Sequence, residues 1–320
     1  MNYRLLGRTG LKVSEISLGT WAFGNNVYGG VPEEDAIKTI ESGIDLGINL
    51  FDTAPQYGTA LQDGAAEIVL GNALKGKRQK VCISTKFGRN PTIDNGNSQF
   101  YKSRIIKSVE ESLKRLQTDY IDILFFHSPF SADEINDDVW EGLAQVKKQG
   151  KIRFIGHSVS RIHQTEDMAI QWAKENKIDV VQVVLSLMNR ESLNLIEKLQ
   201  SQNIGIFARE SLANGFLSGN FTKDTRFSKG TLNSRYSKEE LVSRIEQVNK
   251  FKFLIRNDIT KMPQAALRWA LDQAGISTVL SGAKNILELK GAVSASNALS
   301  LTEDELKLAK KILKQNFEAA

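Results

Sequence analysis

Two side chains able to handle a proton follow an apolar segment of the chain and stand five residues apart. Asp52 and Tyr57 belong to residues 49–58, which begin as an apolar strand and end in a turn with proline and glycine. Catalytic groups of parallel α/β proteins lie where strands end and loops begin. Tyr57 could therefore give a proton to a substrate carbonyl, with Asp52 helping to set its pKa. A structural interpretation is equally open, in which Asp52 caps the next turn and Tyr57 is a half-buried loop aromatic.

Two more ionisable residues stand near the ends of the next two apolar segments. Residues 81–87 carry Lys86, and residues 121–127 finish with His127. A lysine is seldom buried without a partner, so we expect Lys86 to pair with Asp52 on the neighbouring strand. The lysine cation would favour the phenolate of a nearby tyrosine and lower its pKa. His127 alone would be a structural histidine, but beside this pair it predicts a pocket for a carbonyl that receives hydride.

Strand-like and helix-like segments alternate along the chain. Apolar strand-like runs occupy residues 16–21, 49–54, 81–87, 121–127, 152–158, 180–186, 205–211 and 278–283. Helical spacing is found over residues 33–46, 102–117, 139–148, 162–174, 192–200 and 263–274. This alternation predicts a parallel sheet covered by helices. Eight units predict an α/β fold of the closed (β/α)8 TIM barrel type, with an N-terminal hairpin over residues 3–14 and a C-terminal helix over residues 302–317.

No linker or change in composition divides the 320 residues, so we expect one domain over residues 1–320. Three long loops follow strands, over residues 88–100, 128–135 and 215–236. In a barrel they would lie on the face that carries the active site, where they would decide which substrate is bound.

The composition limits the class of protein. A hydrophobic content of 41% and a charged content of 25% are typical of a soluble globular protein. No signal peptide or apolar run long enough to span a bilayer is present, and the single cysteine excludes an intrachain disulfide, which fits a cytoplasmic protein. The net charge of +5 is spread out, and its densest cluster, residues 75–80, is predicted to be a solvated loop. We expect no nucleic-acid or membrane partner.

The three histidines do not suggest a metal site. His127, His157 and His163 do not form a ligand set, so we expect no metal. His157 precedes the end of its strand by one residue and is expected to be a neighbour of the site.

With Asp52, Tyr57, Lys86 and His127 in this order, the chain resembles the aldo-keto reductase superfamily. Residues 52–58, Ser84-Thr85-Lys86 and His127 are similar to the Asp–Tyr–Lys–His tetrad of that family. Residues 4–14, 18–21, 213–219 and 282–285 are similar to its flanking motifs. The resemblance implies a barrel that binds NADPH, with Tyr57 as general acid, Lys86 and Asp52 as the pair that tunes its pKa, and His127 as the residue that orients the substrate. Besides Asp52, it implies a cofactor-binding set of Gly19, Thr20, Trp21, Ser158, Gln182, Arg209, Ser211, Leu212, Gly215, Ser281, Gly282, Ala283, Lys284 and Glu288.

Several positions depart from the family pattern. Arg209 stands where an aromatic residue commonly stacks on the nicotinamide; it could stack in its place, pair with Glu210, or face a substrate anion. Lys284 could bind a 2′-phosphate, whereas Glu288 would repel one, so NADPH is expected and NADH is not excluded. Trp21 is either a substrate-pocket aromatic or part of the core.

The function predicted is NADPH-dependent reduction of an aldehyde or ketone, with a keto-sugar among the candidate substrates. Two alternatives remain: an NAD-dependent alcohol or sugar dehydrogenase running in reverse, and an NAD(P)H-binding regulatory subunit with little turnover. A lyase or hydrolase on the same barrel would need a metal cluster or a carboxylate pair at the strand ends, and the sequence offers neither.

Overall fold

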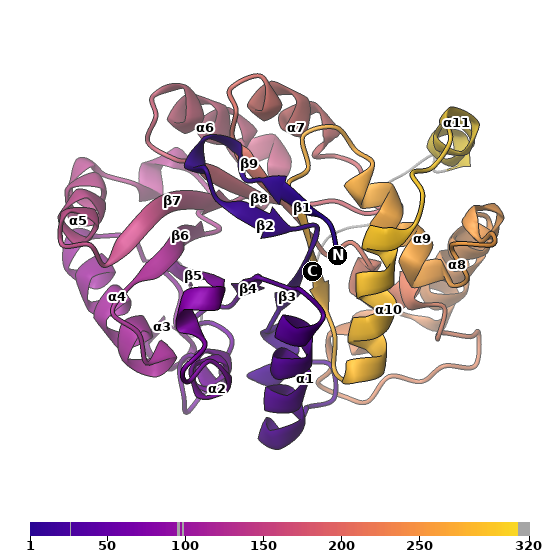
Figure 1. Cartoon of the computed structure of the whole chain (residues 1–320), viewed down its shortest axis with the longest axis horizontal. Helices are drawn as coiled ribbons and strands as arrows, with labels where there is room; N and C mark the ends of the chain where they lie inside the picture. The colour runs from indigo at the N-terminus through magenta and orange to yellow at the C-terminus, as the bar shows by residue number, and fades with distance from the viewer. Residues whose placement is uncertain (26, 95–96, 98, 313–320) are drawn as a thin grey trace.

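The computed structural model describes residues 1–25, 27–94, 97 and 99–312. Within them, eight parallel strands close into a barrel in chain order, and helices surround it (Figure 1). All eight strand-like runs of the sequence are strands: β3 (Ile16–Gly19), β4 (Leu50–Asp52), β5 (Cys82–Phe87), β6 (Ile121–His127), β7 (Ile152–Ser158), β8 (Val180–Val184), β9 (Gly205–Arg209) and β10 (Thr278–Gly282). The prediction of a (β/α)8 barrel is confirmed.

The helices with clear apolar spacing are where the sequence places them, to within three residues at each end. They are α1 (Glu33–Asp45), α4 (Lys102–Leu116), α5 (Asp137–Lys148), α6 (Ile162–Lys174), α7 (Leu193–Gln200) and α9 (Met262–Leu271). The C-terminal helix α11 is described over Glu303–Ile312, and residues 313–317 of its predicted range lie outside the described residues. The sequence reading did not single out α2 (Ala65–Ala73), α3 (Pro91–Asp94), α8 (Lys238–Asn249) and α10 (Ile286–Asn297).

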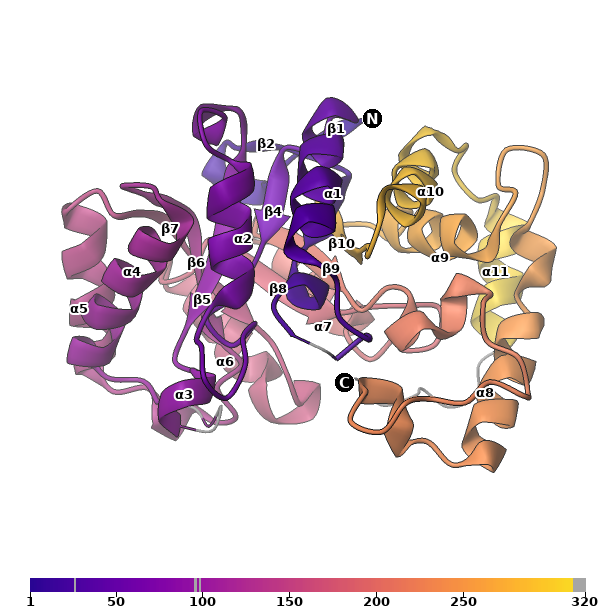
Figure 2. The ribbon, with the colours of Figure 1, turned by 90° about the horizontal axis from the view of Figure 1, so that it is seen from below.

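The predicted hairpin consists of β1 (Tyr3–Leu5) and β2 (Lys12–Ser14), paired antiparallel. It covers the end of the barrel opposite to the long loop after β9 (Figure 2). Leu6 and Val13 of this hairpin are fully buried and pack with Leu50 and Phe125 in one apolar cluster. The hairpin therefore closes the N-terminal end of the barrel and leaves the opposite end for a site.

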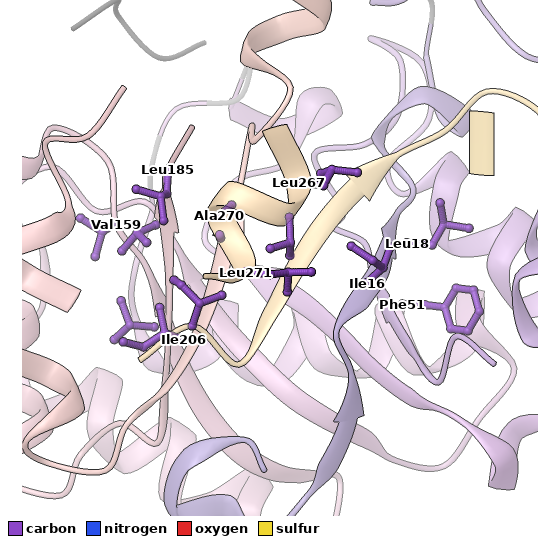
Figure 3. Close-up of a cluster of buried hydrophobic side chains, with 14 of the residues drawn as sticks. Ile16, Leu18, Phe51, Val159, Leu185, Ile206, Leu267, Ala270 and Leu271 are labelled. Atoms are coloured by element: carbon purple, nitrogen blue, oxygen red, sulfur yellow. The ribbon is translucent and has the colours of Figure 1, made fainter. Parts of the chain in front are cut away.

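Alternation along the strands separates an apolar face from a polar one. Side chains such as Ile16, Leu18 and Phe51 belong to the apolar cluster between strands and helices, which also contains Leu267 and Leu271 of α9 (Figure 3). Residues between them, such as Asp52 and Lys86, point to the opposite face because successive side chains of a strand alternate. The inner face is thus apolar at the N-terminal end and polar at the C-terminal ends of the strands.

The three long loops follow β5, β6 and β9, as expected, although residues 95–96 and 98 of the first lie outside the described residues. None of the described helices has the length and apolar character needed to cross a membrane. The assignment of residues 1–320 to one domain stays a prediction.

Candidate active site

A cleft of about 1750 Å³ opens at the C-terminal ends of the barrel strands. Its walls include all four residues of the predicted tetrad: Asp52, Tyr57, Lys86 and His127. They come from the ends of β4, β5 and β6 and from the loop after β4. Neighbouring parallel strands therefore bring together side chains that are up to 75 residues apart in the sequence.

Asp52 and Lys86 form the expected ion pair at the base of the cleft. The Lys86 Nζ lies 2.7 Å from Asp52 Oδ2, and the two side chains are only 1% and 3% exposed. The ammonium also donates to the Thr53 carbonyl at 2.8 Å, and the Ser84 hydroxyl donates to Asp52 Oδ1 at 2.8 Å. Burial opposes the charge on Lys86, but Asp52 and Tyr57 outweigh it and hold the lysine pKa above its usual value. The lysine is therefore a fixed cation.

Tyr57 completes this group from the loop. Lys86 Nζ lies 3.1 Å from the Tyr57 hydroxyl. Burial raises the pKa of Tyr57, while the Lys86 cation lowers it and Asp52 raises it, and the net pKa is above 10.0. The lysine acts in the direction that the sequence predicts, but burial, which the sequence does not reveal, is the larger effect. Tyr57 is consequently a neutral phenol that holds a proton to give.

The loop that carries Tyr57 is fixed from two sides. Its carbonyl accepts a hydrogen bond of 3.0 Å from the amide of Ala66, at the start of α2. On the other side the chain at Gly24 approaches so closely that a Cβ there would lie 2.0 Å from the Tyr57 carbonyl oxygen. This approach lets Trp21 stack on Tyr57, with ring centroids 6.1 Å apart and planes at 29°. Trp21 is thus a wall of the cleft and not a core residue.

His127 faces Tyr57 edge-on, with 6.2 Å between ring centroids. Its Nδ1 is buried and has no hydrogen-bond partner among the described residues. Burial, and then the cations of Lys86, Arg89 and Arg209, hold the pKa of His127 well below its usual value of 6.5. The neutral imidazole can donate a hydrogen bond to a carbonyl oxygen without carrying a charge.

Two residues of the predicted cofactor-binding set lie on the next two strands, β7 and β8. Ser158 pairs with His127 in the sheet register, and Gln182 pairs with Ser158. The Ser158 hydroxyl donates to Gln182 Oε1 at 3.2 Å, and Gln182 Nε2 donates to Asp52 Oδ1 at 3.2 Å. Gln182 is therefore bonded directly to the tetrad, and Ser158 is linked to it through Gln182.

Two buried hydroxyls indicate that a polar ligand fits along the rest of the cleft. Ser211 and Ser281 are 1% and 2% exposed, and neither hydroxyl has a hydrogen-bond partner among the described residues. Beside them, a Cβ added at Gly282 would meet nothing within 4 Å. Unpaired buried polar groups are costly, so such a site is suited to a ligand that supplies the missing partners. These residues fit the nicotinamide cofactor that the sequence predicts.

Most of the predicted cofactor set lines the cleft: Gly19, Trp21, Asp52, Ser158, Gln182, Arg209, Ser211, Leu212, Gly215, Ser281, Gly282, Lys284 and Glu288. Thr20 and Ala283 do not. Thr20 is fully buried because its amide and hydroxyl both donate to the Asp52 carbonyl, at 2.9 and 3.1 Å. Ala283 is turned into the apolar core. Neither residue borders the cleft, and their place in the cofactor-binding set stays a prediction.

His157 is not a neighbour of the site, so that expectation was wrong. Strand alternation turns it away from the cleft, and its ring lies 5.1 Å from that of Trp172 on α6. Across the described residues, no group of three or more histidine, cysteine or acidic side chains gathers where it could hold a metal ion.

Arg209 takes one of the three roles considered for it. Its guanidinium forms an ion pair with Glu210 and donates to the Val159 carbonyl and the Ser160 hydroxyl, both at 3.2 Å. Pairing with Glu210 is therefore present in the structure. Arg209 remains on the wall of the cleft, close enough to lower the pKa of His127.

The sequence reading missed several residues of the cleft wall. Tyr28 packs edge-on against Trp21 at 5.4 Å, Arg89 donates to the His127 carbonyl, and Phe130 and Arg161 also line the cleft. They stand in irregular loops, where neither apolar spacing nor a motif marks them.

For helix α8, which was not predicted, the sequence does carry a signal. Ser237 and Glu240 form a capping box at its start, with hydrogen bonds of 2.8 and 3.2 Å.

The sequence matches the Aldo/keto reductase family over residues 15–314. It is 32% identical to the aldo-keto reductase YhdN of Bacillus subtilis (strain 168), over 99% of this chain and 95% of that protein. It is 29% identical to the NADH-specific methylglyoxal reductase of Escherichia coli (strain K12), over 96% of this chain and 97% of that one. The fold matches the glycerol dehydrogenase AKR11B4 from Gluconobacter oxydans with a TM-score of 0.82 and 28% identity, over 99% of both chains.

The chain therefore belongs to the aldo/keto reductase family. It is an NAD(P)H-dependent oxidoreductase that reduces carbonyl compounds. The family, the fold and the class of enzyme predicted from the sequence are confirmed, and the regulatory-subunit alternative is not favoured.

Proposed function

We propose that the chain reduces an aldehyde or ketone by donating the phenolic proton of Tyr57 to the carbonyl oxygen. The observation that carries this proposal is the contact of 3.1 Å between the Tyr57 hydroxyl and the buried Lys86 ammonium. A bound nicotinamide cofactor supplies the hydride. As negative charge develops on the carbonyl oxygen, Tyr57 gives up its proton, and Lys86 stabilises the phenolate that remains.

The other two members of the tetrad support this step. Asp52 keeps Lys86 charged and fixes its position through the contact of 2.7 Å. His127, being neutral, donates a hydrogen bond to the same carbonyl oxygen and orients it toward Tyr57. Trp21, stacked on Tyr57, covers the reacting group and limits the access of water.

Ser158 and Gln182 would hold the carboxamide of the cofactor, since both are buried beside the tetrad and already carry hydrogen-bonding groups into the cleft. Ser211, Ser281 and the backbone around Gly282 would hold its phosphates. These roles follow from the placement of polar groups along one continuous cleft.

The choice of cofactor depends on Lys284 and Glu288. The sequence predicts NADPH, yet Glu288 Oε2 accepts a hydrogen bond of 2.8 Å from the Lys284 amide, which places a carboxylate in the segment expected to hold a 2′-phosphate. A carboxylate repels a phosphate and accepts from a ribose hydroxyl. We propose that the enzyme accepts both NADPH and NADH, with Glu288 limiting the preference for NADPH.

The test follows the loss of NADPH and NADH absorbance with a panel of aldehydes, keto-sugars and quinones. Tyr57→Phe is expected to lower carbonyl reduction by a factor of at least about 100 while cofactor binding is retained. Tyr101→Phe, which removes an exposed phenol away from the cleft, is the matched control and should keep full activity. Unchanged turnover in Tyr57→Phe would contradict the mechanism.

The reverse reaction should be assayed with the alcohols that correspond to this panel and with oxidised cofactor. A structural relative is named a glycerol dehydrogenase, which supports testing oxidation as a second candidate direction. A cytoplasmic location and the lack of nucleic-acid partners stay predictions from the sequence.

A further inference from the structure

The Arg161 guanidinium, on the wall of the cleft, has no anionic partner among the described residues. Arg161 lies in the short loop after β7, immediately before α6, is exposed, and lines the cleft. Among the described residues, no carboxylate forms an ion pair with it and no acceptor takes a hydrogen bond from its side chain. Its one contact of note is with the ring of Phe130, whose centroid lies 3.9 Å from the guanidinium carbon.

This contact fixes the position of the charge. Phe130 is held between two arginines, since the Arg89 guanidinium carbon lies 4.4 Å from the same ring. Stacking on an aromatic face leaves the N–H groups at the edge of a guanidinium available to a ligand. Arg161 is therefore held in place without using its hydrogen-bond donors.

Arg89, which shares the Phe130 ring with Arg161, also connects Phe130 to His127. Its guanidinium donates to the carbonyls of His127 and Ser128, at 2.8 and 2.9 Å. A second connection runs from Ser160, next to Arg161, to the Ser128 hydroxyl at 3.0 Å. Burial is the main cause that lowers the pKa of Arg89; Glu134, the next largest, raises it, and the Arg161 cation lowers it by a smaller amount. Arg161 is thus linked to His127 through the Phe130 ring and Arg89, and all four residues line the cleft.

Among the described residues, neither nearby carboxylate forms an ion pair with Arg161. Glu210 is paired with Arg209. Glu134 accepts hydrogen bonds from the amides of Phe130 and Ser131, at 2.6 and 3.1 Å. The wall of the cleft therefore carries, at Arg161, a positive charge that no carboxylate of the described residues pairs with.

Arg161 stands on a part of the cleft wall away from the segment proposed to hold the cofactor phosphates. It follows β7, the strand that carries Ser158, whereas the segment expected to hold the cofactor phosphates follows β10. Two strands, β8 and β9, separate these positions in the barrel. A cofactor held at Ser281 and Ser158 would leave Arg161 to the substrate.

We propose that Arg161 binds an anionic group of the substrate, so that the preferred carbonyl compounds carry a carboxylate or a phosphate several bonds away from the carbonyl. This inference rests on the proposed function, because it places the carbonyl at Tyr57 and His127. A guanidinium edge can hold either anion with two parallel hydrogen bonds. Arg89 and Arg209 add to the positive field without giving up their own partners.

The test compares matched aldehydes with and without the anion. One pair is 4-formylbenzoate and 4-formylbenzamide; the other is glyceraldehyde 3-phosphate and glyceraldehyde. Wild type is expected to prefer the anionic member of at least one pair by about tenfold in kcat/KM, which corresponds to about 1.4 kcal/mol. Arg161→Gln should remove this preference, mainly through KM, and Arg161→Lys should retain part of it.

Lys174→Gln is the matched control. It removes one positive charge from the last residue of α6, the helix that begins directly after Arg161. Lys174 is exposed and does not line the cleft. The preference should persist in this variant and should weaken in wild type at high salt, because exposed charges are screened. A preference for 4-formylbenzoate over 4-formylbenzamide, or for glyceraldehyde 3-phosphate over glyceraldehyde, supports the inference and identifies the anion.

Equal use of both members of each pair, or a preference that survives Arg161→Gln, would overturn the inference and leave the proposed function intact. Reduction of other carbonyls with no reduction of either pair would do the same. Failure of the protein to reduce any carbonyl compound would overturn both.

Discussion

Gln182 and Asp52 are joined by a hydrogen bond of 3.2 Å across the base of the cleft. The same Asp52 oxygen accepts from Ser84, and its other oxygen binds Lys86. The residue expected to hold the cofactor carboxamide therefore also holds the carboxylate that fixes the catalytic lysine. The role proposed for Gln182 would couple cofactor binding to the geometry of the tetrad through one buried amide.

The first prediction concerns this amide. Gln182→Leu should weaken the binding of the nicotinamide cofactor by about tenfold, because the loss of about one hydrogen bond in a buried site costs roughly 1–1.5 kcal/mol. Titration of the cofactor against protein fluorescence measures the dissociation constant. Gln164→Leu, an exposed position on α6, should bind the cofactor as wild type does. An unchanged dissociation constant in Gln182→Leu would exclude this role.

The second prediction concerns the buried ion pair. Lys86→Met should abolish turnover and destabilise the fold by about 3–5 kcal/mol, because Asp52 would remain as an unpaired buried charge. The double variant Asp52→Asn with Lys86→Met should be more stable than Lys86→Met alone, since it carries no buried charge at this pair. Urea unfolding of wild type, both single variants and the double variant measures the coupling. Equal stability of Lys86→Met and wild type would contradict a buried, ionised pair.

The barrel and the tetrad could be predicted because both depend on the regular part of the chain. Each strand is a short apolar run, and Asp52, Lys86 and His127 stand at or next to strand ends, which parallel strands bring to one edge. Helices α1 and α4 have one apolar face each, so their spacing was clear. In α10, by contrast, Ile286 and Leu287 stand beside the buried Leu289, and no single face is marked.

The rest of the site depends on loops and burial, which the sequence does not show. The close approach of Gly24 to Tyr57, and the stacking of Arg161 on Phe130, are set by irregular backbone. Burial also reversed the expected net effect on Tyr57, whose pKa is raised although Lys86 lowers it. The residue types could indicate that Lys86 and Tyr57 interact, but not that burial affects the Tyr57 pKa more than the Lys86 charge does.

The third prediction concerns cofactor preference. Glu288→Gln should raise the ratio of kcat/KM for NADPH to that for NADH by about tenfold, because it removes a negative charge from the segment expected to hold the 2′-phosphate. Steady-state kinetics with both cofactors at a fixed aldehyde concentration measure this ratio. Glu197→Gln removes an exposed carboxylate on α7, away from the cleft, and should leave the ratio unchanged. If Glu288→Gln leaves the ratio unchanged, this carboxylate does not face the cofactor.

The last prediction concerns His157, which is fully buried and has no partner for either ring nitrogen among the described residues. Burial lowers its pKa to about 3, from 6.5. Between these values the unfolded chain binds the proton and the folded chain does not, so stability is full above pH 6.5 and falls as the pH falls. From pH 7 to pH 5 this residue should cost about 2 kcal/mol in the free energy of unfolding, a loss that His157→Leu should remove. His163→Gln, at an exposed histidine, should keep the wild-type dependence, and His127 contributes equally in every variant. Urea unfolding at both pH values decides the matter, since parallel losses in wild type and His157→Leu would mean that His157 is not the group that titrates.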